Sequence, residues 1–471
     1  MDEAAKRRRH RNERIAAALF VLAALATLFA FLRWNRQQEE AFRRERTYIP
    51  KPDTITPEVL LLRDYLRIDT TNPPGNEILA ARWLAARLQE NGIASEIIES
   101  APGRANLYAR IRGKQRGGGL LLLNHTDVVP AEAKEWSQPP FAGNVKFNML
   151  WGRGALDMKS IGLCELFAFI DVAKSGVQPE HDLVFLAVAD EERGGGQGMR
   201  WLIEHRPDVI DGVRYAIDEG GIVETKEERV IYFGIEIGSK QTVSLVLRSP
   251  AKEPLMAARK ALEPYISRRE PERITPEVRR FLRELAPTRV EVQHELADID
   301  RSVAEGTFWK LAAGYRELTQ NVVWAGWPAV ADDGQWELSI ALANLPDENP
   351  DARIAWVRSL VEPHGVSVTV TSKNGPVPYS SADSDFYRLI ASEAARKYQT
   401  RAGTEILHRS TSDSRYLRVR GIDAYGVFPY PVDWFQTGGI HGKDERIRLD
   451  WFLDGIDLTR RIVRAYVFGQ R

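Results

Sequence analysis

From Thr56 onwards the chain shows two kinds of apolar pattern, residues at helical spacing and short continuous runs. The helical spacing predicts helices over 56–68, 78–92, 161–174 and 199–205. The apolar runs predict strands over 95–98, 106–111, 119–124 and 182–189. Strands that alternate with helices are typical of an α/β layer, so we expect a mixed, largely parallel sheet here.

The pattern changes near Gln241 and changes back near residue 374. A strand-like stretch, TVSLVLRS, is followed by a charge-rich helical region over 252–311 and then by two more strand-like runs, WELSIALANL and VSVTVTS. Helices are expected again over 381–398 and 449–468. We therefore expect residues 241–373 to form an inserted α+β lid domain, and residues 54–240 and 374–471 to form the two parts of one α/β domain.

The N-terminal segment is unlike the rest of the chain. Residues 15–33 begin with eighteen consecutive uncharged residues, IAAALFVLAALATLFAFL, which as a helix would be about 27 Å long. A basic cluster precedes them within residues 1–14, and a charged stretch follows at 34–53. This pattern predicts a cytoplasmic tail, a transmembrane signal anchor and a stalk, with the main body on the non-cytoplasmic side. A cleaved signal peptide is the alternative.

Composition narrows the class of protein. With 44% hydrophobic and 28% charged residues in 471, the chain is typical of globular proteins with two folded domains. Lysine plus arginine and aspartate plus glutamate both number 65, so nothing in the net charge favours a nucleic-acid partner. The single cysteine, Cys164, lies in an apolar stretch and is expected to be buried and structural.

Two stretches place metal-type ligands after apolar runs. In LLLNHTDVVP a strand leads into His125, and Asp127 follows two residues later, on the same side of an extended chain. Asp127 could then accept a proton from His125 and fix its tautomer. In WGRGALDMK, Asp157 follows two glycines that allow a tight turn.

Two further stretches bring acids to strand ends. AVADEERGGG carries Glu191 and Glu192 at the end of a strand, and YAIDEGG carries Asp218 and Glu219. Adjacent carboxylates repel one another unless a cation compensates them. His441 lies far downstream in GGIHGKD. Histidines mixed with carboxylates at successive strand ends favour a divalent metal site, and this ligand set suits zinc.

In this order, the stretches HTDVVP, GRGALDMKSIG, ADEERGGG, IDEGG, TSDSRYL and GGIHGKDE resemble the di-zinc aminoacylase/carboxypeptidase family. That family includes acetylornithine deacetylase, succinyl-diaminopimelate desuccinylase and carboxypeptidase G, and the chain looks closest to its carboxypeptidase S and N-acyl-amino-acid hydrolase branch. The resemblance implies a zinc-exopeptidase-like catalytic domain, an inserted lid and two Zn²⁺, for which Co²⁺ or Mn²⁺ are possible substitutes.

The resemblance also implies roles for single residues. His125 would bind one zinc, Asp157 would bridge both, and Glu219 would complete the first site, with Asp218 as the alternative. Glu192 and His441 would bind the second zinc. Glu191 matches the general base, and Asp127 matches the partner of His125. Arg415 in TSDSRYL matches an arginine that holds a substrate carboxylate, a task that suits its planar fork of donors.

The lid region departs from the family pattern, because it lacks the histidine that the family places soon after the first lid strand. His294 is the only histidine between Gln241 and Leu360, and its charged surroundings, VEVQHELAD, predict an exposed helical residue. The sequence thus predicts hydrolysis of an amide bond in a small peptide or N-acyl amino acid with a free carboxylate. A catalytically impaired, membrane-anchored binding protein is the alternative. The resemblance also implies a possible homodimer through the lid.

Overall fold

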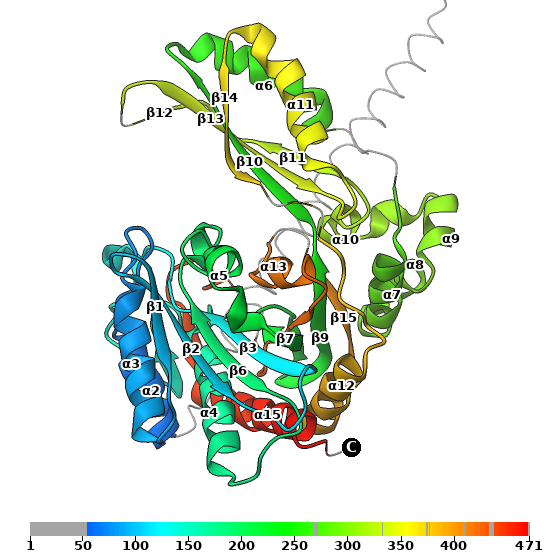
Figure 1. Cartoon of the computed structure of the whole chain (residues 1–471). Helices are drawn as coiled ribbons and strands as arrows, with labels where there is room; N and C mark the ends of the chain where they lie inside the picture. Colours follow the sequence, from blue (N-terminus) through cyan, green and yellow to red (C-terminus); the bar gives the residue numbers. More distant parts are fainter. Residues whose placement is uncertain are drawn as a thin grey trace, which may run out of the picture. The chain divides into compact units, whose positions relative to one another are not determined.

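The computed structural model describes residues 54–469, except 268–271, 332, 374, 376, 408–409 and 433–437. Residues 54–471 form one compact unit (Figure 1). The expected tail, anchor and stalk over 1–14, 15–33 and 34–53 lie outside the described residues.

The main sheet of this unit is mixed, as the sequence predicted. Its strands follow the order β1-β2-β6-β3-β7-β16-β9-β15, with β8 paired to β9. Strands β3, β6, β7 and β16 pair in parallel, as do β9 and β15, whereas β1, β2 and β8 pair antiparallel. The bounds are β1 Glu96–Ala101, β2 Arg104–Ile111, β3 Gly119–His125, β6 Leu183–Val188, β7 Val213–Asp218, β8 Val223–Lys226, β9 Arg229–Ser239, β15 Ala402–Leu407 and β16 Asp423–Gly426.

The central strands are buried on both faces, which explains why they are continuous apolar runs. Alternate residues of β3 belong to different cores: Leu120 and Leu122 lie in one cluster, and Leu121 and Leu123 in the other. The first core includes side chains of α2 (Pro57–Leu66), α3 (Glu77–Glu90), α4 (Lys159–Lys174), α12 (Asp385–Tyr398) and α15 (Leu449–Val467). The second includes α5 (Met199–His205) and α13 (Ser414–Arg418) (Figure 1).

The inserted region contains a second sheet with a core of its own. Its order is β11-β13-β10-β14, with β12 paired to β13, and α6 and α11 pack against it. The bounds are β10 Gln241–Ser249, α6 Lys252–Ser267, β11 Val322–Ala325, β12 Ala329–Val330, β13 Trp336–Asn344, α11 Pro350–Val361 and β14 Ser367–Lys373. The domain boundaries at 241 and 373 stay predictions.

The helices between α6 and β11 pack differently. They are α7 (Pro276–Leu285), α8 (Gln293–Ala297), α9 (Ile299–Ala304) and α10 (Ala313–Glu317). Apolar residues of this stretch, among them Phe281, Leu285 and Leu318, are buried in the core of the main sheet and not in that of the second sheet. Part of the inserted region is therefore built into the larger core.

A three-stranded sheet connects distant loops of the chain. Strand β17 (Arg446–Arg448) pairs with β5 (Met149–Trp151), which pairs with β4 (Asn144–Lys146). Because β17 follows His441 and β5 precedes Asp157, this pairing brings together two loops that are far apart in the sequence.

The expected localisation, a single-pass membrane protein, is corrected by the helices of the described residues. None of them combines the length and the hydropathy needed to cross a membrane. The longest, α15, has 19 residues but includes Asp450, Asp454 and Arg460, and such charges are costly in hydrocarbon.

Candidate metal centre

The candidate ligands gather at the carboxyl ends of three neighbouring strands. His125 ends β3, Glu191 and Glu192 follow β6, and Glu219 follows β7. These strands are parallel neighbours in the order β6-β3-β7. Parallel strands end at the same edge of a sheet, where α/β proteins usually bind their ligands.

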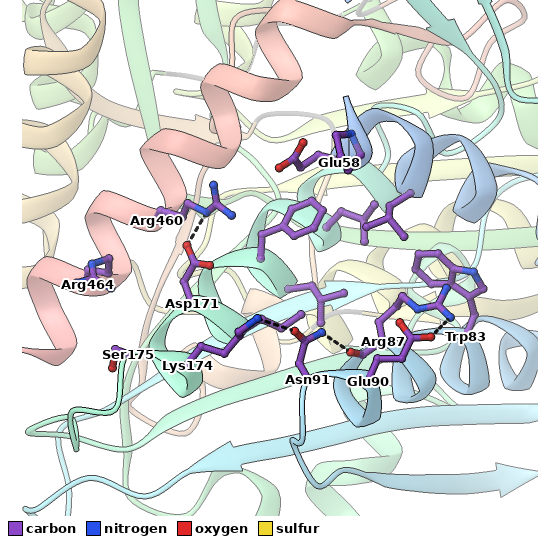
Figure 2. Close-up of a pocket in the computed structure, with 16 residues that line it drawn as sticks. Glu58, Trp83, Arg87, Glu90, Asn91, Asp171, Lys174, Ser175, Arg460 and Arg464 are labelled. Carbon is purple, nitrogen blue, oxygen red and sulfur yellow. Dashed lines mark hydrogen bonds and ion pairs between the residues drawn. The ribbon is translucent and has the colours of Figure 1, made fainter. Parts of the chain in front are cut away.

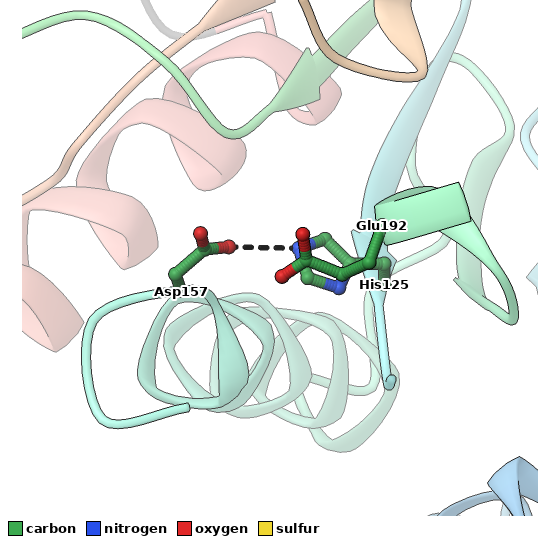
Figure 3. Close-up of side chains that lie close together, drawn as sticks. All are labelled: His125, Asp157 and Glu192. Carbon is green, nitrogen blue, oxygen red and sulfur yellow. Dashed lines mark hydrogen bonds and ion pairs between the residues drawn. The ribbon is translucent and has the colours of Figure 1, made fainter. Parts of the chain in front are cut away.

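His125 lies at the centre of this group and is buried. Its Nε2 lies 2.9 Å from Asp157 Oδ1 (Figure 3) and 3.8 Å from Glu219 Oε2. Its Nδ1 lies 3.0 Å from the carbonyl oxygen of Asp127 and 3.5 Å from the Asp127 carboxylate. Burial alone would lower the pKa of His125, but hydrogen bonds to Asp127, Asp157 and Glu219 outweigh it and raise the pKa well above its usual value.

Asp157 lies between the two histidines. Its Oδ2 is 3.0 Å from His441 Nε2, and the same Nε2 is 3.0 Å from Glu192 Oε2. Hydrogen bonds to His125 and His441 outweigh burial and hold the pKa of Asp157 well below its usual range. Hydrogen bonds to Asp157 and Glu192 raise the pKa of His441 to about 10.

The donor set fits divalent cations. His125, Asp157 and Glu192 each offer a ligand atom within 4.8 Å of the others, and so do His125, Glu191 and Glu219. The buried Oε1 of Glu192 has no hydrogen-bond partner among the described residues. Burial raises the pKa of Glu192 and, more strongly, that of Glu219. Cations held by these oxygens would offset the repulsion between the carboxylates, and mixed imidazole and carboxylate donors suit zinc.

The turn after β6 is held by groups from other parts of the chain. Asp190 adopts the left-handed conformation, with φ of 67°. Asn72 donates hydrogen bonds to Asp190 at 2.9 Å and to Asp127 at 2.8 Å. The Asp127 carboxylate also accepts from the backbone N–H groups of Glu191 and Glu192. This network directs both glutamates into the site, although neighbouring residues of an extended strand would face opposite ways.

Glu445 organises the loop that carries Asp157. It is completely buried and accepts hydrogen bonds from the backbone N–H groups of Gly154, Leu156 and Asp157 at 2.9, 2.7 and 3.1 Å. The guanidinium of Arg153 donates to the same carboxylate at 2.7 Å. Four donors therefore fix Glu445, and through it the direction of Asp157.

Arg415 faces Glu191 inside the site. Its Nη1 lies 3.2 Å from Glu191 Oε1 and donates to the Ser412 carbonyl oxygen at 2.7 Å. Asp413 is farther away, at 3.7 Å from Nη2. Burial raises the pKa of Glu191 to about 7, although Arg415 and His125 oppose that change. Such a carboxyl exchanges protons near neutral pH, as a general base must.

Asp218 points away from this group. Its Oδ2 accepts hydrogen bonds from the backbone N–H and the hydroxyl of Ser414, at 2.8 and 2.9 Å. Glu219 is thus the acid of the IDEGG stretch that lies near His125.

Most of the residues singled out in the sequence come together, namely His125, Asp127, Asp157, Glu191, Glu192, Glu219, Arg415 and His441. His294 is exposed in α8. In one detail the structure differs from expectation, since the nearest Asp127 atom to His125 is its carbonyl oxygen. The sequence did not predict the roles of Asn72, Asp190 and Glu445. Asp190 and Glu445 stand inside the motifs quoted above, but their importance comes from contacts with residues that are distant in the sequence.

Comparisons with known proteins identify the family of the chain. The profile of Peptidase family M20/M25/M40 matches residues 121–465. Aminoacylase-1A of Rattus norvegicus is 29% identical over 430 residues, which cover 88% of this chain and 96% of that protein. Succinyl-diaminopimelate desuccinylase of Bradyrhizobium sp. is 36% identical over 205 residues, 42% of this chain and 51% of that protein.

Solved structures share the fold. A metallo-carboxypeptidase of the M20 family from Sulfolobus solfataricus superposes with a TM-score of 0.69 at 17% identity, covering 88% of this chain and 99% of that one. The resemblance noted in the sequence is confirmed, and these matches do not favour a binding protein without activity. None of the findings supports the expected membrane partner or a homodimer.

Proposed function

The chain belongs to peptidase family M20/M25/M40, and from that premise we propose that it hydrolyses the amide bond of an N-acyl amino acid or small peptide with a free carboxylate. Membership makes it a metal-dependent amidohydrolase. The aminoacylase matches, which extend over 88% of the chain, favour an N-acyl amino acid, in which the acyl group supplies the carbonyl of the scissile bond and the amino acid supplies the amine.

We propose that the site holds two divalent ions. Zinc is the preferred ion, and cobalt or manganese are possible substitutes. His125, Asp157 and Glu219 would hold one ion, and Asp157, Glu192 and His441 the other. The support is the position of Asp157 between the two histidines, with one oxygen towards each. When bound, such ions supply Lewis-acid polarisation of a carbonyl and lower the pKa of water from ~15.7 towards ~7.

In this proposal Glu191 is the general base. Its largely buried carboxylate offers an oxygen within 4.8 Å of ligand atoms of His125 and Glu219. It would take a proton from the attacking water and return it to the leaving amine. Asp127 would act as a positioning residue, because its carboxylate accepts from the backbone N–H of Glu191 and its carbonyl oxygen faces His125 Nδ1.

Arg415 would bind the substrate carboxylate. Its guanidinium is buried beside Glu191, so an arriving carboxylate would exchange with that contact and free the base. A planar fork can form two parallel hydrogen bonds with a carboxylate. The ion pair between Arg415 and Glu191, beside the candidate metal ligands, is the observation that carries the proposal.

The test compares an N-acetyl amino acid with its carboxamide, on the metal-loaded enzyme and after chelation. We expect turnover of the acid alone, loss of turnover after chelation, and recovery on adding Zn²⁺. Glu191→Gln should lower kcat by about 10²–10⁴-fold, the usual contribution of a general base, while zinc content stays unchanged. Equal turnover of the acid and the amide, or full activity without metal, would contradict the proposal.

A further inference from the structure

A cavity separate from the candidate metal centre is lined by residues of α7, α10, β8, β9 and β15. Figure 1 labels α7, α10, β9 and β15. The volume of the cavity is about 480 Å³. None of the candidate metal ligands lines it. Strand β15 lies three positions from β7 in the sheet, which at ~4.8 Å per strand corresponds to about 14 Å.

The walls of this cavity are mostly apolar, and they include Phe281, Leu285, Leu318, Ile406 and Val432. Three of these, on α7 and after α10, come from the part of the inserted region that packs on the main core. An apolar cavity of this size suits an aliphatic chain.

One carboxyl group in the wall, that of Glu405, has no cation opposite it among the residues that the structure describes. Glu405 is only 8% exposed, and its Oε2 accepts a hydrogen bond from the backbone N–H of Ile222. Within the described residues its Oε1 accepts none. Arg289, the cation of the cavity wall, is paired with Glu224 and also donates to Tyr315.

The surroundings of Glu405 make the site attractive to a cation. Burial, together with the negative charges of Glu224 and Glu236, raises the pKa of Glu405 to about 8. Among the described residues, an ionised Glu405 lacks a compensating charge, and a protonated one lacks an acceptor for its proton. Buried carboxylates are usually paired, because the isolated charge is costly.

We propose that this cavity binds an alkylammonium group, as found in aliphatic amines and lysine side chains, with the ammonium on Glu405 and the chain against the apolar walls. The ammonium would donate to the open Oε1, and the methylene groups would replace water at the apolar walls. The inference goes beyond the hydrolase function; its calorimetric test does not depend on that function, and only the assignment of the ammonium to substrate or free amine rests on it.

The other prominent groove of the described residues differs in the pairing of its charged side chains. It lies between α2, α3, α4 and α15, and some of the charged side chains along it pair with one another (Figure 2). Arg460 contacts Asp171 at 2.7 Å, and Arg87 contacts Glu90 at 2.5 Å. Charges paired in this way do not call for a ligand, so we make no proposal for that groove.

The test is calorimetric titration of the full chain with n-hexylamine and with 1-hexanol, which has the same chain and no charge. We expect the amine to bind at least about tenfold more tightly, since a hydrogen bond between charged groups exceeds a neutral one by about that factor. In wild-type protein at pH 7, amine binding should also release a proton from Glu405, seen as a heat that differs between two buffers. Equal affinities, or binding without proton release, would overturn the proposal.

Variants separate this cavity from other amine sites. Glu405→Gln should weaken hexylamine by about tenfold and leave hexanol unchanged, whereas Glu393→Gln, at another buried glutamate, should change neither. Coordination of the amine to an ion in the metal centre would survive Glu405→Gln and would overturn the proposal. If Glu405→Gln raises KM for Nα-acetyl-lysine but not for Nα-acetyl-norleucine, the ammonium comes from the substrate; if both KM values stay unchanged, the ligand is a free amine.

Discussion

Replacing Glu445 by glutamine should reveal how firmly the Asp157 loop is held. The carboxylate of Glu445 accepts from two donors on each oxygen: Leu156 and Asp157 on Oε1, Arg153 and Gly154 on Oε2. A glutamine keeps one oxygen and turns an NH₂ group towards the other two donors. Two buried donors then lose their acceptor, at about 1–3 kcal/mol each, so we expect a loss of about 2–6 kcal/mol in the free energy of unfolding.

The same substitution should also weaken metal binding. Because Glu445 accepts from the backbone N–H of Asp157 itself, its loss would loosen the direction of that carboxylate. Partners that orient a ligand without touching the metal typically account for 10–100-fold in affinity. Urea unfolding of the metal-free protein would measure the change in the free energy of unfolding. Zinc competition with a chromophoric chelator would measure the change in zinc affinity.

A matched control is Glu228→Gln, at an exposed glutamate whose contact with Arg448 is 3.5 Å long. This variant should change neither the free energy of unfolding nor the zinc affinity. An unchanged unfolding midpoint in Glu445→Gln would refute the hydrogen-bond argument. Lower stability with unchanged zinc affinity would show that Asp157 is oriented by something else.

Three further outcomes are expected. Arg415→Ala should raise KM for an N-acetyl amino acid by about 10–100-fold, in line with a charged hydrogen bond of about 1.5–3 kcal/mol, and Arg415→Lys should recover only part of it; equal KM shifts for the carboxamide would count against this role. Chelation should lower the thermal unfolding midpoint, because ions present at 100 times their Kd add about 2.7 kcal/mol to the free energy of unfolding. A midpoint that is the same with and without chelator would mean that the protein holds no ion. The raised pKa of Glu405, about 8, keeps this carboxyl protonated in the folded state, whereas it ionises near pH ~4.3 in the unfolded chain. As the pH rises between these two values, the free energy of unfolding of the wild type should therefore fall by up to ~1.4 kcal/mol per pH unit. The Glu405→Gln variant should lack this fall. Parallel pH curves for the two proteins would argue that Glu405 is not buried as described.

The sequence predicted the central strands well because each is buried on both faces. Continuous apolar runs such as LLLL in β3 have few alternatives in an α/β pattern, and the acids that follow them mark the strand ends. The inserted region was harder, because α7 has a clear apolar face, yet periodicity does not reveal which partner covers it. Phe281 and Leu285 could equally have packed on the second sheet, but they lie in the main core.

The choice between Asp218 and Glu219 illustrates a second limit of prediction from sequence. Both acids stand at the end of β7, and alternation along the strand only says that they differ in direction. Asp218 is drawn away by Ser414, which is 196 residues later in the chain. Asn72 and Glu445 were missed for the same reason, since their importance lies in long-range hydrogen bonds that no local pattern encodes.

The wide spacing of the candidate ligands has a consequence for biosynthesis. His125 and His441 stand more than 300 residues apart, so at ~5–20 residues per second a ribosome would need roughly 15–60 s to travel between them. During that interval a nascent chain exposes several of the acids and one histidine, a set able to capture ions weakly and without selectivity. With the proposed ligand set, tight and selective metal uptake would wait for translation past His441, so the identity of the bound ion would depend on which metals are available from that stage onwards.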